Sequence, residues 1–391
     1  MALDDIRYLL APSDAWTWQN DDERLLGAFI STLGENSDFP EFNEGGIVIL
    51  GVTESRGNPS NPSCSAAAYE VRHWLGQLRV PEGCQGILDV GDIRPGATIE
   101  DTYFAVRMAV AEFIRAGQTV IVIGGSHDLT HACYMAYAEL EQVANVAVVD
   151  SSFDLGDSEQ PLDSANFLSR MVLEQPNHLF NLSHIGHQSY HVSTSEVDLM
   201  KKLYFEAIRL GDVQADLEEL EPTVRNADIV SIDLASIRFS DLPGNYRVSA
   251  NGLYGEEACR ICRYAGLSDK VSVLGLFELT TAMDLTGQSA HLVSQMIWYF
   301  MQGHASRVGD TPIREDTSLT RYTVAMQDGE YPTVFYKSMV SDRWWMEVPY
   351  PSRKDSRYTR HVAVPCSYRD YQSACNDEVP DRWWQTYQKL I

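Results

Sequence analysis

The chain has 391 residues, of which 44% are hydrophobic and 22% are charged, so it is long enough to bury a sizeable core. Its formal net charge is −25, and its 30 basic residues form no stripe that could neutralise a phosphate backbone. This balance excludes nucleic acid and anionic membranes as expected partners.

The N-terminal sequence MALDDIRYLLAPSDAW has no basic segment followed by an apolar stretch, and the chain has no run of about 18 apolar residues. We therefore expect a cytoplasmic protein. Its seven cysteines are scattered and odd in number, which argues against a disulfide framework. Cys259 and Cys262 form a CxxC pair within GEEACRICRYAGL, but this pattern is typical of a helix. A buried helix is therefore favoured there over a metal or redox site.

Short runs of apolar, β-branched residues recur along the chain, and each ends in a polar or glycine-rich cluster. They lie at residues 46–52, 118–128, 145–154, 227–236 and 270–279. Runs without alternation are typical of strands buried on both faces of a parallel sheet. Helical patterns occupy residues 66–78, 102–117, 130–142 and 255–266. The alternation predicts a doubly wound α/β fold, with a mostly parallel sheet and helices on both faces.

In this architecture, ligand sites form beyond the carboxyl ends of the strands, so the polar residues that follow the runs should converge. These residues are His127, Asp128, Asp150, Ser152, Asp154, Asp233, Ala235 and Glu278. One histidine and three aspartates form a set suited to Mn²⁺ or a similar divalent ion. Converging carboxylates repel one another unless a cation or protons compensate them. Asp128 begins a helix and is equally suited to cap it.

The sequence changes character after about residue 305. Pro and Tyr become frequent, and the string DRWW occurs twice, at 342–345 and 381–384. We therefore divide the chain into an N-terminal segment (1–44), an α/β domain (45–305) and an appended C-terminal extension (306–391). The extension is expected to pack on the α/β domain or on a neighbouring subunit, and packing within the chain is favoured.

Three ordered motifs resemble those of the ureohydrolase superfamily of arginases, agmatinases and formimidoylglutamases. GGSHD at 124–128 resembles that family's GGDHS or GGxHE string, and VVDSSFD at 148–154 resembles its strand ending in DAHxD. SIDLASIRF at 231–239 resembles SxDxDxxDP. The resemblance covers about residues 45–300 and is nearest to the formimidoylglutamase branch. It implies an arginase-like fold and a homo-oligomer.

Members of this family hold two Mn²⁺ ions bridged by a hydroxide. The resemblance implies that the first ion's ligands are present, namely His127, Asp150, Asp154 and Asp233. The second ion's own ligands are missing, because Ser152 stands at the position of a histidine and Ala235 at that of an aspartate. A hydroxyl is a poor replacement for imidazole, and alanine offers no ligand atom. We therefore expect at most one divalent ion per chain, with Mn²⁺ the first candidate, or none.

Three further residues are candidates for the site. Glu278 resembles the family's substrate-orienting carboxylate, and His187, within SHIGHQSYH, is the histidine of that string expected to face the site. Arg238 replaces the aspartate that ends the third motif. A planar guanidinium suits the charge of a lost cation, so our hypothesis is that Arg238 reaches the ligand carboxylates. The alternative is a solvated arginine in a loop.

Two functions follow from this resemblance. In the first, the half-degraded metal centre lacks ordinary ureohydrolase activity, and the protein serves a binding, regulatory or assembly role. In the second, it is a one-metal hydrolase of a linear amidine C–N bond in a formimidoylglutamate-like or guanidino substrate. The loss of both ligands that belong to the second ion alone favours the first function, because a second metal further activates the bridging water and clamps the leaving group. A small amidine or amino-acid-like ligand is compatible with either function.

Overall fold

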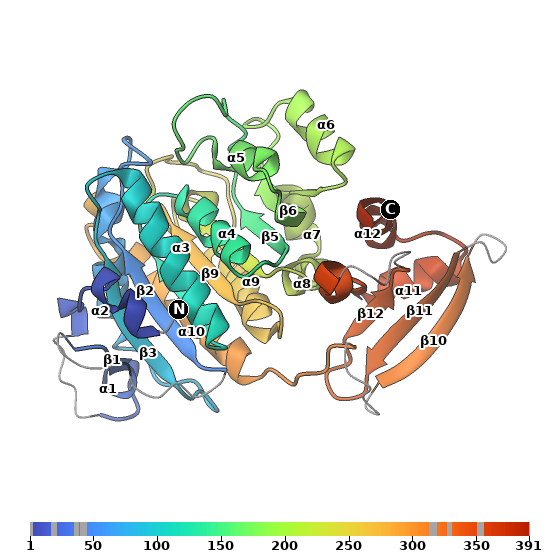
Figure 1. Ribbon diagram of the computed structural model, residues 1–391, viewed down its shortest axis with the longest axis horizontal. Helices are drawn as coiled ribbons and strands as arrows, with labels where there is room; N and C mark the ends of the chain where they lie inside the picture. The colour runs from blue at the N-terminus through green and yellow to red at the C-terminus, as the bar shows by residue number, and fades with distance from the viewer. Residues whose placement is uncertain are drawn as a thin grey trace.

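The computed structural model describes residues 3–16, 22–34, 39, 45–312, 319–326, 331–349 and 356–390. Within them, nine parallel strands form one sheet in the order β1, β3, β2, β4, β9, β8, β5, β6 and β7 (Figure 1). Their bounds are Ser31–Thr32 (β1), Ile47–Val52 (β2), Ile87–Ile93 (β3), Thr119–Ile123 (β4), Ala144–Val149 (β5), Leu179–His187 (β6), Glu206–Arg209 (β7), Ile229–Asp233 (β8) and Val273–Phe277 (β9). Parts of the predicted segments 1–44 and 306–391 lie outside the described residues.

Helices cover both faces of this sheet. One face carries α2 (Ala67–Leu75), α9 (Gly255–Leu267) and α10 (Gln288–Ala305). The opposite face carries α3 (Ile99–Arg115), α4 (Leu129–Glu139) and α5 (Phe167–Leu173). The other described α-helices of this part are α1 (Leu26–Phe29), α6 (Thr194–Lys202), α7 (Leu210–Ala215) and α8 (Glu221–Arg225). The predicted doubly wound α/β fold is confirmed.

The five apolar runs form β2, β4, β5, β8 and β9, and the residues of each strand are buried. Side chains alternate between the faces of a strand, so Ile121 joins the core under α9 and α10, whereas Val120 and Val122 join the core under α3 and α4. Both faces therefore need apolar residues, which explains the absence of polar alternation in these runs.

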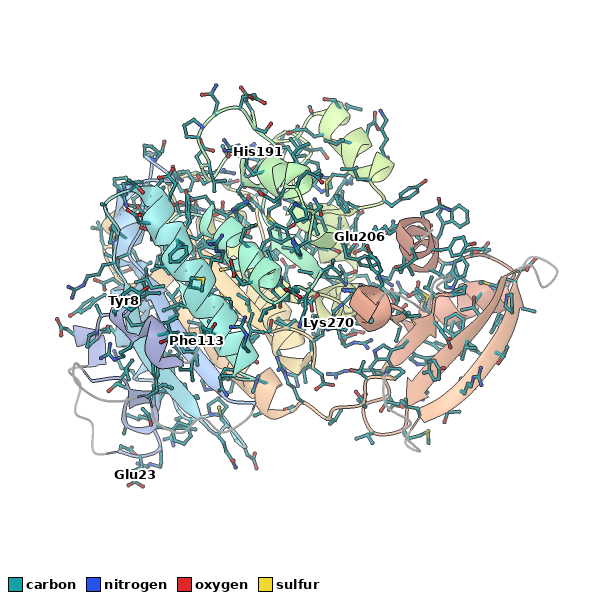
Figure 2. All side chains as sticks on the ribbon, viewed as in Figure 1. Tyr8, Glu23, Phe113, His191, Glu206 and Lys270 are labelled. Carbon is teal, nitrogen blue, oxygen red and sulfur yellow. The ribbon has the colours of Figure 1, made fainter. Side chains whose placement is uncertain are left out.

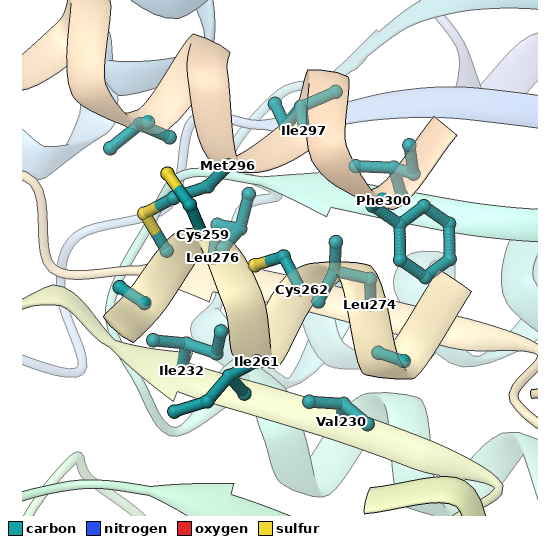
Figure 3. Close-up of a cluster of buried hydrophobic side chains, with 14 of the residues drawn as sticks. Val230, Ile232, Cys259, Ile261, Cys262, Leu274, Leu276, Met296, Ile297 and Phe300 are labelled. Atoms are coloured by element: carbon teal, nitrogen blue, oxygen red, sulfur yellow. The ribbon is translucent and has the colours of Figure 1, made fainter. Parts of the chain in front are cut away.

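The CxxC pair lies within α9, as the helical pattern predicts. Cys259 and Cys262 are buried against α10, near Met296 and Ile297 (Figure 3). Burial raises the pKa of the Cys259 thiol to about 12 and that of Cys262 well above its ordinary value. The pair therefore belongs to the hydrophobic core.

The C-terminal extension forms a second, antiparallel sheet beside the first (Figure 1). Its described elements are β10 (Leu319–Met326), β11 (Tyr331–Ser338), β12 (Trp344–Glu347), β13 (Ala363–Cys366), α11 (Tyr368–Cys375) and α12 (Asp381–Leu390). Trp344, Trp345 and Trp383 are buried, and Trp383 belongs to an apolar cluster that includes Val143 and Phe180 of the α/β domain. The extension therefore packs on its own chain. In the described part of the chain, no helix is both long enough and apolar enough to cross a bilayer.

Candidate metal centre

Four of the candidate site residues lie at the carboxyl ends of four adjacent central strands, β4, β9, β8 and β5. His127 follows β4 after a glycine pair at 124–125, both with positive φ. Asp150 directly follows β5, Asp233 ends β8, and Glu278 directly follows β9. Because parallel strands all end at the same edge of the sheet, residues far apart in the chain meet there.

The structure brings the four predicted ligands together. The Nδ1 atom of His127 lies 3.4 Å from Oδ2 of Asp154. It lies 3.8 Å from Oδ2 of Asp150 and 3.9 Å from Oδ2 of Asp233. His127, Asp150 and Asp233 each offer a ligand atom within 4.8 Å of the other two. A divalent ion binds its ligands at about 2.0–2.2 Å, so separations of this size suit one ion.

Unpaired polar atoms mark the centre of this group. Within the described residues, Nδ1 of His127, Oδ2 of Asp150 and Oδ2 of Asp154 are buried without a hydrogen-bond partner. Buried polar atoms are nearly always paired, so three such atoms facing one another fit a bound cation. Asp154 adopts a φ of 45°, a left-handed conformation that non-glycine residues rarely adopt outside sites that constrain them.

A second layer of hydrogen bonds orients the imidazole. Nε2 of His127 lies 3.0 Å from Oγ of Ser231, which lies 2.6 Å from Oγ1 of Thr130. Metal-binding histidines are commonly held in this way through their other ring nitrogen. Nδ1 is thereby left facing the carboxylates.

Burial perturbs the ionisation of every predicted ligand. It raises the pKa of Asp150 to about 8, with the charge of Asp154 adding to the effect. It raises the pKa values of Asp154 and Asp233 to about 6, and it lowers the pKa of His127. A neutral imidazole among carboxylates that need a compensating charge is a donor set suited to Mn²⁺.

Ser152, one of the two positions that lack a second-ion ligand, lies beside a different cation. Oγ of Ser152 accepts a hydrogen bond of 2.5 Å from Nη1 of Arg247. The same guanidinium lies 3.7 Å from Oδ1 of Asp150 and 3.7 Å from Oδ1 of Asp154. Burial alone would lower the pKa of Arg247, but the surrounding carboxylates raise it. A permanent positive charge therefore stands on the side of the site where the ligands are lost.

A buried asparagine positions Arg247. Nδ2 of Asn245 donates to the carbonyl oxygens of Ala235 (3.4 Å) and Ile237 (3.1 Å), just beyond the end of β8. Its Oδ1 accepts a hydrogen bond of 2.9 Å from the backbone N–H of Arg247, whose Nε donates to Oη of Tyr246 at 2.9 Å. The loop carrying Arg247 is therefore fastened to the backbone that carries the lost ligand position at Ala235.

Arg238 lies elsewhere, which corrects the hypothesis that it reaches the ligand carboxylates. Its Nε donates to Oδ1 of Asp241 at 2.8 Å, and its guanidinium carbon lies 3.9 Å from the ring centre of Tyr254. The charge beside the carboxylates comes from Arg247 instead. The sequence does not single out Arg247, because this residue lies in the loop GNYRVSANG, outside all three motifs. Tyr246 precedes Arg247, and Tyr254 contacts Arg238, so a neighbouring tyrosine does not distinguish the two arginines.

Glu278 lies at the site edge, where its carboxylate is fully engaged. Oε1 accepts from the backbone N–H of His127 at 2.9 Å. Oε2 accepts from Nδ2 of Asn58 and from Nδ2 of Asn61, both at 2.9 Å. Burial and the charge of Asp233 raise its pKa to about 8. The carboxylate thus links the loop around residue 60 to the start of α4.

Replacing Asn61 with leucine is expected to destabilise the fold by about 1–3 kcal/mol, because Oε2 and the carbonyl oxygen of Glu278 each lose a buried donor. The measurement is urea denaturation. Ser60→Ala, an exposed neighbour, serves as the control and should change stability by less than about 0.5 kcal/mol. Equal stabilities for the two variants would mean that these hydrogen bonds do not hold Glu278.

His187 is buried at the end of β6, with its ring centre 4.9 Å from that of Phe153. It lines a cavity of about 340 Å³ whose walls include Arg209, Arg238 and Tyr254. The neighbouring His184 holds the backbone of the site at Ser152, because its Nε2 lies 2.8 Å from the carbonyl oxygen of Ser152. Burial lowers the pKa of His184 to about 3, so its imidazole is neutral.

Asp128 stands at the N-cap position of α4, but its side chain makes no capping hydrogen bond. Oδ2 instead accepts from Oη of Tyr103 at 2.6 Å. Of the two roles that the sequence left open for Asp128, helix capping is therefore wrong. Gly57 packs so closely that a Cβ atom there would lie 2.0 Å from Oδ1 of Asp128, so Asp128 joins α3 and the loop around residue 57 to the site.

Comparisons with known proteins bear on the family and the fold of this chain. A family model described as the arginase family matches residues 46–303. A formimidoylglutamase from Corynebacterium efficiens is 23% identical over 305 residues, which cover 74% of this chain and 95% of that protein. The Trypanosoma cruzi formiminoglutamase solved with Mn²⁺ has a TM-score of 0.62 at 21% identity, covering 67% of this chain and 94% of that one. The Bacillus subtilis formimidoylglutamase has a TM-score of 0.65 at 17% identity, covering 74% and 95%.

Proposed function

The chain belongs to the arginase family. We propose that it is a one-ion member in which the guanidinium of Arg247 supplies the positive charge that a second ion would otherwise provide. In this role it binds a small amidine or amino-acid-like ligand without ordinary ureohydrolase turnover. The observation that carries the proposal is the guanidinium of Arg247, 3.7 Å from both Asp150 and Asp154 and bonded to Ser152.

Electrostatics favours one ion over two. Two like charges in a buried site repel each other strongly, because little solvent screens them. A second divalent ion beside Arg247 would meet a fixed positive charge and would find no private ligand at Ser152 or Ala235. His127, Asp150, Asp154 and Asp233 would hold the first ion, whose Lewis acidity would polarise a bound ligand or water.

The surrounding residues favour binding over turnover. The charge of Arg247 opposes the effect of burial on the pKa values of Asp150 and Asp154, and its guanidinium orients Ser152 through a hydrogen bond. Glu278 already accepts three hydrogen bonds from protein groups. Its carboxylate oxygens are therefore already occupied, which leaves the group poorly placed to orient a substrate, the role that the family resemblance implies for it.

Metal analysis and activity assays test this proposal. The purified protein should bind at most about one Mn²⁺ per chain. With Mn²⁺ added, it should release no urea, ammonia or formamide at ordinary enzymatic rates from arginine, agmatine, guanidinobutyrate or formimidoylglutamate. The same four compounds should be tested for binding by calorimetry. Two tightly bound ions per chain would contradict the proposal.

A one-metal hydrolase of a linear amidine is the second candidate, and the unpaired atoms of His127, Asp150 and Asp154 favour it. These atoms can hold an ion, and one ion alone can activate water. Hydrolysis at ordinary rates by protein containing one Mn²⁺ per chain would establish this candidate in place of the binding protein. Replacement of Asp150 with asparagine should then abolish both metal binding and turnover.

A further inference from the structure

A cavity of about 310 Å³ lies between the α/β domain and the C-terminal extension. The α/β domain contributes Arg225 at the end of α8 and Ser268–Lys270 between α9 and β9. The extension contributes Arg343, Trp345 and Arg360. Lys270 marks this junction in Figure 2. Because Lys270 precedes β9 and Glu278 follows it, the cavity lies at the opposite end of the strand from the metal centre.

Four basic residues line this cavity in a chain that carries a large excess of acidic residues: Arg225, Lys270, Arg343 and Arg360. Arg225 is almost fully buried, with 4% of its side chain exposed, and its guanidinium lies 4.6 Å from the ring centre of Trp345. Its Nε donates to Glu221 at 2.8 Å and its Nη2 to the carbonyl oxygen of Trp344 at 3.1 Å. Within the described residues, its buried Nη1 has no partner.

The acidic residues nearby do not fully balance these cations. Glu221 lies 2.8 Å from Arg225 and 3.7 Å from Arg343. Asp228 lies 2.7 Å from Arg360 and 3.7 Å from Lys270. Asp269 is the acidic residue in the cavity wall itself. Asp310 also attracts Arg343, and Arg307 adds a further cation close to Asp269 and Arg343, so five cations face four carboxylates.

Burial lowers the pKa values of two of these cations. It lowers the pKa of Lys270 to about 8 in spite of the nearby Asp228. It also lowers the pKa of Arg343, and the neighbouring charge of Arg225 adds to this effect. Incompletely compensated buried cations are costly, and an anion that accepts their hydrogen bonds offsets that cost.

From this geometry we infer that the cavity is a binding site for a small anion carrying a carboxylate or phosphate group. Guanidinium groups present paired donors that match the oxygens of either group. A volume near 310 Å³ lies at the lower end of the range for small-molecule sites, which favours a compact ligand. The family model ends at residue 303, so Arg343, Trp345 and Arg360 add a site that the common fold does not contain.

Calorimetric titration of the full-length protein in chloride buffer, with inorganic phosphate in one arm and succinate in the other, tests this inference. At least one anion should bind with a Kd below about 1 mM. The arm that binds more tightly identifies the group that the site prefers. Failure of both anions to bind below about 1 mM would overturn the inference. Binding here does not depend on the metal content, so the outcome is independent of the proposed function.

Arg343→Gln and Lys270→Met should each weaken binding of the preferred anion at least about tenfold. Arg321→Gln is the matched control, because Arg321 is an exposed arginine on β10 of the same extension. Thermal unfolding checks that each variant remains folded. If Arg343→Gln loosens the extension, Lys270→Met still tests whether the anion binds in this cavity, because Lys270 belongs to the α/β domain. Unchanged affinity in a folded Lys270→Met variant would place the bound anion elsewhere.

Discussion

The triple variant Ser152→His, Ala235→Asp, Arg247→Ala is expected to bind about two Mn²⁺ ions per chain, whereas the double variant that retains Arg247 should bind about one. The two new residues restore an imidazole and a carboxylate at the positions where the family has them. A second ion would share Asp150, whose Oδ1 lies 3.7 Å from the guanidinium of Arg247. Removal of that guanidinium frees the carboxylate oxygen and removes the repulsion.

The control for this experiment exchanges a different arginine. Ser152→His, Ala235→Asp, Arg238→Ala should behave like the double variant, because Arg238 is paired with Asp241 and contacts Tyr254. The readout is elemental analysis after gel filtration, with unfolding curves to show that the variants are folded. If the variants with and without Arg247 take up equal amounts of Mn²⁺, Arg247 does not replace an ion.

Replacing Trp383 with alanine is expected to destabilise the protein by about 3–5 kcal/mol, the usual cost of truncating a fully buried tryptophan. Trp383 has no exposed surface, and its Nε1 donates to the carbonyl oxygen of Glu347 at 3.1 Å. It belongs to the cluster that also buries Val143 and Phe180 of the α/β domain. The loss should appear in urea denaturation, with the extension unfolding first.

The neighbouring residue provides a close control. Trp384 occupies the next position in the same DRWW string, but 41% of it is exposed. Trp384→Ala should therefore change stability by no more than about 0.5 kcal/mol. Comparable losses from the two variants would show that α12 does not depend on this buried face. An unchanged unfolding curve for Trp383→Ala would mean that the extension contributes little to the stability of the fold.

The α/β fold is largely predictable from the sequence, because strands buried on both faces must be apolar throughout. Such runs are recognisable in β2, β4, β5, β8 and β9. The strand β3 is harder to recognise, since its sequence ILDVGDI contains two aspartates and a glycine. Arg72 neutralises both, at 2.6 Å from Asp89 and 2.5 Å from Asp92. That pairing depends on α2 packing beside the strand, which local sequence does not encode.

The sequence by itself determines which residues could bind an ion. His127, Asp150 and Asp233 each follow or end a recognisable strand, and the carboxyl ends of parallel strands meet at one edge. The missing ligands at Ser152 and Ala235 are equally visible in the motifs. Only the tertiary structure decides which arginine supplies the lost charge. Arg238 and Arg247 are nine positions apart in irregular chain, where no periodicity predicts side-chain direction. The choice depends on Asn245 bonding the backbone of Ala235 and Ile237, a contact between segments that only the folded chain brings together.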